Sequence, residues 1–143
     1  MRATYRVVSG LIALAVVFQA AAVAFGTFGV INEVEGGAVV TSDSDLPNAG
    51  PMLHGIGGTM VIPLLVLVLL IVSFFAKVRG GVKWALLLLL AVAVQITLGF
   101  AAFEAPAVGL LHGVNAFVIL GLALTAARAA RVTTTTAADA VRV

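Results

Sequence analysis

The sequence predicts an all-α integral membrane protein, an antiparallel four-helix bundle made of two repeated helix hairpins. Of its 143 residues, 62% are hydrophobic and only 10% are charged, whereas a soluble domain carries about 25% charged residues. Four stretches each supply the roughly 20 apolar residues that a helix needs to cross the hydrocarbon core. A set of polar residues also recurs at matching places in the two halves, which indicates an internal repeat.

The expected spans lie at about 7–31, 52–76, 82–103 and 107–127, within a transmembrane domain of residues 1–132. A polar loop, a basic turn and a short turn connect them in that order. Residues 133–143 are small and polar and are expected to form a disordered cytoplasmic tail. A cleavable signal peptide is an alternative for the first span, disfavoured because the apolar run continues well past its small residues.

The charges predict the orientation. Every lysine and arginine lies on one side of the expected membrane: Arg2, Arg6, Lys77, Arg79, Lys83, Arg128, Arg131 and Arg142. The positive-inside rule therefore places both termini in the cytoplasm. The alanine, valine and glycine bias suggests a multi-pass protein in the plasma membrane of a bacterium. Because the net charge is only +2, the basic residues indicate topology rather than binding to nucleic acid.

The two halves share a pattern of glutamine, proline and histidine. The first half has Gln19, Pro51 and His54, and the second has Gln95, Pro106 and His112. Each hairpin is expected to run outward with a glutamine in its first helix and to return with a histidine near the start of its second. The glutamines are expected about 10 Å deeper than the histidines, bonding between helices or contacting a cofactor or quinone. Pro63 is expected to kink the second span.

His54 and His112 are the only histidines of the chain. They lie on the second and fourth spans, which are diagonal neighbours in an up-down-up-down bundle, so both imidazoles can face one central space. Such a pair suits the axial positions of haem iron. The same helix faces add four candidate cofactor-binding residues: Gly57, Gly58, Asn115 and Ala116.

Other roles for this pair stay open. The histidines could bond structurally, bind another metal or form part of a quinone site, and Asn115 could orient an imidazole or join two helices. Zinc is disfavoured because two imidazoles are too few for its usual four-coordinate shell. The chain has no cysteine, which excludes disulfides and thiolate metal sites.

The run Gln95-Ile96-Thr97-Leu98-Gly99, followed by Pro106 and His112 and echoed by Gln19 and His54, resembles a half-unit of the haem A synthase family. The resemblance implies that His54 and His112 are the axial ligands of one haem. The haem would be b-type, because no Cys-x-x-Cys-His motif is present for covalent attachment. Family members have eight spans and a reactive carboxylate shortly before the first ligand. This chain has four expected spans and Asn48-Ala49-Gly50-Pro51 at that place.

Three functions follow from these patterns. The first is a haem b-binding membrane protein for electron transfer, exchanging electrons with quinone or serving as a small cytochrome subunit of a respiratory complex. The alternative is a cofactor-free accessory subunit of a larger membrane complex. The third is a haem-modifying oxidoreductase that acts as a homodimer. A transporter is disfavoured because the spans carry almost no polar path and no charge at their centre.

Overall fold

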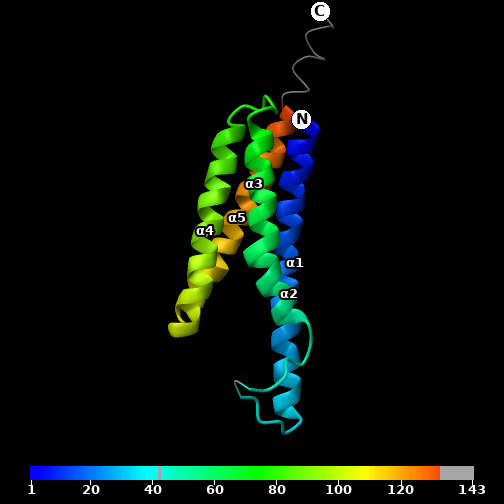
Figure 1. Cartoon of the computed structure of the whole chain (residues 1–143), viewed down its shortest axis with the longest axis vertical. Helices are drawn as coiled ribbons and strands as arrows, with labels where there is room; N and C mark the ends of the chain where they lie inside the picture. Colours follow the sequence, from blue (N-terminus) through cyan, green and yellow to red (C-terminus); the bar gives the residue numbers. More distant parts are fainter. Residues whose placement is uncertain (42, 133–143) are drawn as a thin grey trace, which may run out of the picture.

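A computed structural model of the chain describes residues 1–41 and 43–132. Its elements are α1 (Arg2–Glu35), α2 (Gly50–Ile56), the π-helical turn η1 (Gly57–Val61), α3 (Ile62–Ser73), α4 (Gly81–Glu104) and α5 (Val108–Val132). α2, η1 and α3 follow one another without a break and form one helix, Gly50–Ser73 (Figure 1). The described residues contain helices and turns but no strand, which confirms the all-α prediction. The predicted tail, 133–143, lies outside the described residues.

In the part of the chain that the structure describes, four helices are long and apolar enough to cross a membrane: Arg2–Glu35, Gly50–Ser73, Gly81–Glu104 and Val108–Arg131. Many of their large apolar side chains face outward, among them Leu14, Phe28, Leu64 and Leu90. Such side chains suit a hydrocarbon surrounding and not water, since a contiguous apolar surface is unfavourable on a soluble monomer. The helices therefore indicate a multi-pass membrane protein in contact with lipid.

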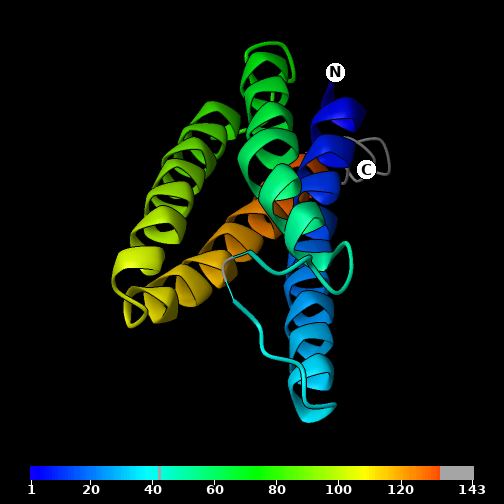
Figure 2. The same cartoon turned by 60° about the horizontal axis from the view of Figure 1, so that its bottom comes forward.

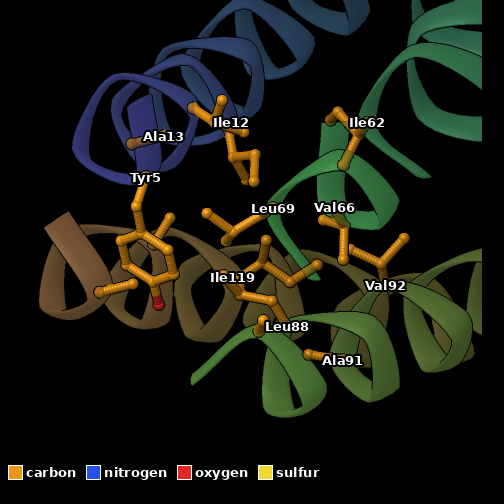
Figure 3. Packing of buried hydrophobic residues seen from close by; sticks show 14 of the residues in the cluster. Tyr5, Ile12, Ala13, Ile62, Val66, Leu69, Leu88, Ala91, Val92 and Ile119 are labelled. Carbon is orange, nitrogen blue, oxygen red and sulfur yellow. The ribbon is translucent and has the colours of Figure 1, made fainter. Parts of the chain in front are cut away.

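Each helix packs against its neighbours in the chain, and α5 also packs against α1. The best-buried side chains come from all four spans and include Ile12, Leu69, Leu88 and Ile119 (Figure 3). This core lies towards the end of the molecule that holds the N-terminus. Towards the opposite end, the α4–α5 hairpin diverges from α1 and α2 (Figures 1 and 2).

Two long-range hydrogen bonds tie α1 to the turn between α3 and α4. The Tyr5 hydroxyl donates to the Gly81 carbonyl at 2.9 Å, and Arg2 Nη2 donates to the Lys77 carbonyl at 3.1 Å. The turn reverses the chain through two positive φ angles, 51° at Lys77 and 71° at Gly80. The basic residues of the N-terminus, of this turn and of the last turns of α5 lie at one end of the molecule (Figure 1).

At the other end, α1 and α2 meet backbone to backbone. A Cβ atom built on Gly50 would lie 2.5 Å from the Ala22 carbonyl oxygen and 2.8 Å from Gly26 Cα, so only glycine fits there. Asn48 holds the start of α2, since its Oδ1 accepts from the Gly50 N–H at 2.9 Å and its Nδ2 donates to the Phe25 carbonyl at 2.9 Å. These contacts set the position of the helix turn that carries His54.

A π-helical turn follows that histidine. The Ile62 N–H donates to the Gly57 carbonyl, five residues back. The next residue, Pro63, has no N–H to donate and cannot form a normal helical bond. The sequence predicts a kink at Pro63, and the structure places the helical irregularity in the turn directly before it. π-helical turns are a recognised cause of helix bending and occur often at functional sites.

Candidate functional site

The structure brings the two histidines together. His54 projects from α2 and His112 from α5, and their ring centroids lie 6.0 Å apart with the ring planes inclined at 60°. Both side chains are half-buried. The residues are 58 positions apart in the sequence (112 − 54), so this proximity arises only from the packing of the helices.

Each histidine makes the same contact with the helix that precedes it. His54 Nδ1 lies 3.2 Å from the Gln19 carbonyl oxygen, and His112 Nδ1 lies 3.1 Å from the Gln95 carbonyl oxygen. A carbonyl oxygen can only accept, so Nδ1 must be the donor in both contacts. In a neutral imidazole the lone pair is then on Nε2. Histidines that bind metals are oriented in this way, with the other ring nitrogen donating to a carbonyl or carboxylate.

These contacts correct one prediction. Gln19 and Gln95 were expected about 10 Å deeper than the histidines from the rise per residue, but their carbonyl oxygens lie within 3.2 Å of the imidazoles. The estimate counted only the rise along each helix and took no account of the overlap between neighbouring helices. The prediction was therefore wrong, and the backbones of both glutamines lie at about the same depth along the bundle as the imidazoles.

The separation of the rings fits two ligands of one metal ion. An imidazole nitrogen binds a metal at about 2 Å and lies about 1.2 Å from its own ring centre, so two imidazoles whose Nε2 atoms point at one ion from opposite sides have centroids about 6.4 Å apart. The observed separation is 6.0 Å. The separation of the two rings is therefore compatible with a bis-histidine metal centre.

A cavity of about 820 Å³ surrounds the two histidines, with walls from all four spans. Its volume falls within the range of about 300–1,000 Å³ that is usual for ligand and cofactor sites. Its lining is apolar except for six polar side chains and contains no charged residue: Gln19, Thr27, His54, Thr59, Gln95 and His112. The site therefore favours a large apolar ligand anchored by a few polar groups.

The other predicted residues divide into two groups. Gly58 and Ala116 line the cavity beside the histidines. Gly57 instead lies against the side chain of Gln19, where the two residues share a smaller cavity of about 160 Å³. Asn115 turns away from the imidazoles and bonds to α4.

Gly99 is a site residue that the sequence showed only as part of the repeated motif. A Cβ atom at this position would lie 3.2 Å from both Cε1 and Nδ1 of His112. That distance is too short for comfortable packing, so the absence of a side chain leaves room for the imidazole. In the first half, the position four residues after the glutamine is Val23, and the nearby Gly26 contacts the ring of Pro51.

The two glutamine side chains differ in their hydrogen bonding. Gln95 Oε1 accepts from Asn115 Nδ2 at 2.8 Å. Gln19 is only 8% exposed, and its Oε1 has no hydrogen-bond partner. Its Nε2 makes one long bond, 3.4 Å, to the Leu53 carbonyl. A buried acceptor without a partner costs about 1–3 kcal/mol. Among the described side chains that line the cavity, Gln19 Oε1 is the one fully buried polar atom without a partner.

Within residues 1–41 and 43–132, no group of three or more His, Cys, Asp or Glu side chains is placed to hold a metal ion. Two imidazoles alone leave half of the usual four-coordinate shell of a zinc ion unfilled. A haem needs only axial ligands from the protein, because its macrocycle supplies the remaining donors. Two imidazole donors therefore match the needs of a haem iron better than those of a bare ion.

No family model matches the chain, and no match was found among curated proteins or solved structures. The resemblance to haem A synthases therefore stays a prediction that rests on the motif residues.

Proposed function

We propose that the chain is a membrane-embedded haem b-binding protein in which His54 and His112 are the two axial ligands. The observation that carries the proposal is the matched pair of imidazoles. Their centroids lie 6.0 Å apart, and each Nδ1 is engaged by a backbone carbonyl, which leaves both Nε2 atoms for the metal. The apolar cavity around them supports a flat, mostly hydrophobic cofactor.

The protein's contribution is to hold and orient the ligands. The Gln19 and Gln95 carbonyls fix the ring tautomers and orient the two imidazoles. Gly99 leaves space beside the His112 imidazole, and the lining of the cavity is mainly apolar. The haem, when bound, would supply one-electron redox chemistry. Electron transfer is therefore the proposed activity, and a small cytochrome subunit of a respiratory complex is a setting that fits it.

The proposal includes the arrangement predicted from the sequence. The four spans form an antiparallel bundle of two related hairpins, supported by the identical histidine–carbonyl contact in each pair of helices. Both termini face the cytoplasm of a bacterium, supported by the basic residues gathered at the end that holds the N-terminus. Quinone, a second copy of the chain and a larger respiratory complex are the candidate partners.

The test is an absorption spectrum of detergent-purified protein, oxidised and then reduced with dithionite. The wild type is expected to show a sharp Soret band and split visible bands on reduction. His54→Ala and His112→Ala should each lose or shift these bands. Thr97→Val is the matched control, because the Thr97 hydroxyl bonds only to the Ala93 carbonyl of its own helix and lies outside the cavity lining.

The competing function is a cofactor-free accessory subunit. A wild type that stays colourless after haem is offered, together with unchanged behaviour of both histidine variants, would favour it. The haem proposal would then be abandoned, and the histidines would be assigned to packing between α1, α2, α4 and α5.

A further inference from the structure

The two glutamines that face the histidines are not equivalent, although their backbones make the same contact. The Oε1 atom of Gln95 accepts a hydrogen bond from Asn115, which lies three residues after His112. The position three residues after His54 is Gly57, which has no side chain to offer. The acceptor Gln19 Oε1 is therefore left without a partner at one side of the cavity.

The contacts of the Gln19 amide show which of its two terminal atoms lacks a partner. Nε2 faces the Leu53 carbonyl at 3.4 Å, where only a donor is tolerated. Turning the amide over would place oxygen against oxygen, so the group without a partner is the acceptor. A Cβ atom at Gly58, which lines the large cavity, would lie 3.6 Å from this oxygen. The terminal torsion of glutamine is broad, so the amide can turn further towards the cavity.

The cavity also extends beyond the two imidazoles. Its lining residues on α1 run from Val16 to Val30, which is about 21 Å along a helix axis. None of the lining residues is charged, which favours a neutral and mainly apolar additional ligand. A partner for Gln19 Oε1 must carry an O–H or N–H donor.

We infer that Gln19 Oε1 is the recognition group for the hydroxyl of a lipid-soluble quinol that enters the cavity from the bilayer. A quinol is neutral, apolar and a hydrogen-bond donor, so it meets each requirement. The oxidised quinone carries only acceptor oxygens and cannot satisfy this atom. The site therefore distinguishes the reduced carrier from the oxidised one. Electron transfer from the bound quinol rests on the proposed haem function, but binding of the quinol does not require haem.

The experiment is anaerobic isothermal titration calorimetry of the detergent-purified protein with a decyl-substituted para-benzoquinol and with the matching quinone. The wild type should bind the quinol about tenfold more tightly than the quinone, the equivalent of one hydrogen bond. Gln19→Leu should abolish that preference by weakening the quinol about tenfold while leaving the quinone unchanged. Thr97→Val should retain the preference.

A second variant tests the same atom without removing it. Gly57→Asn places an amide beside Gln19, as Asn115 lies beside Gln95, and occupies the acceptor. The new Cβ meets the flexible end of the Gln19 side chain, which can shift. This variant should also lose the preference for the quinol. Equal binding of quinol and quinone to the wild type, or an unchanged preference in both variants, would overturn the inference.

The spectrum of the same sample separates the two proposals. A protein that shows bis-histidine haem bands but no preference for the quinol would retain the proposed function and lose only this inference. A colourless protein that prefers the quinol in a Gln19-dependent way would retain the binding site and overturn the haem proposal.

Discussion

The side chain of Asn115 joins α5 to α4 through Gln95. Its Nδ2 donates to Gln95 Oε1 at 2.8 Å and to the Ala91 carbonyl at 2.9 Å, one turn beyond His112. The first pair of helices has no such link, because Gly57 occupies the matching position. Each histidine therefore has a glutamine carbonyl as its Nδ1 partner, but only the pair of α4 and α5 is also joined by an asparagine–glutamine hydrogen bond.

This difference predicts opposite effects of the same substitution in the two halves. Gln95→Leu breaks the bond with Asn115 and should lower the free energy of unfolding by about 1 kcal/mol, in line with polar contacts between membrane helices. Gln19→Leu removes the acceptor without a partner at the loss of only the long Nε2 bond to the Leu53 carbonyl, and should raise the free energy of unfolding by up to about 1 kcal/mol. Reversible unfolding in mixed detergent, followed by circular dichroism, measures both.

A double-mutant cycle isolates the Gln95–Asn115 contact. The coupling free energy between Gln95→Leu and Asn115→Leu should be about 0.6–1.7 kcal/mol, the range found for such pairs in membranes. Additive effects of the two substitutions would contradict a direct bond between these side chains.

Gly99 gives a test of the room around His112. Gly99→Ala places a methyl group 3.2 Å from the imidazole and should displace the ring. We expect haem affinity to fall about tenfold, because a ligand moved by a few tenths of an ångström loses part of its alignment with the metal. Gly121→Ala is the control, since a Cβ atom there meets nothing within 4 Å. Titration with haem, followed at the Soret band, compares them, and equal affinities would argue against crowding at Gly99.

Much of this architecture could be predicted from the sequence, because it depends on apolar length. The four membrane-compatible helices follow from hydrophobicity alone, and the repeated pattern drew attention to His54 and His112 before their proximity was known. Contacts that depend on the register between helices were not predictable in this way. The level of Gln19 and Gln95 relative to the histidines is one such property, and the partner of Asn115, an imidazole or a neighbouring helix, is another.

The π-helical turn shows a second limit. Pro63 indicated a disturbed helix, but the sequence does not show which turn absorbs the missing hydrogen bond. The structure places the extra residue at Gly57–Val61, directly after the helix turn of His54. Local backbone geometry of this kind depends on how α2 is held against α1, which single-residue preferences do not encode.

The close approach of α1 and α2 predicts a severe effect at Gly50. In Gly50→Ala the new methyl group meets the backbone of Ala22 and Gly26, which cannot move as a flexible side chain would. We expect the free energy of unfolding to fall by about 1–3 kcal/mol, as for other overpacked sites. Gly10→Ala, where nothing lies within 4 Å, should instead be neutral or stabilising by about 0.5–1 kcal/mol. Thermal unfolding of the two variants makes the comparison, and similar losses in both would contradict a contact specific to Gly50.

The proposed orientation can be tested with single cysteines, because the natural chain contains none. Ser44 lies in the exposed loop between α1 and α2, and Ala3 is exposed in the first turn of α1. The positive-inside rule places the basic end in the cytoplasm. In intact cells, a membrane-impermeant maleimide should therefore label Ser44→Cys and leave Ala3→Cys unlabelled. Both variants should react once the membrane is permeabilised, and labelling of Ala3→Cys alone in intact cells would reverse the proposed orientation.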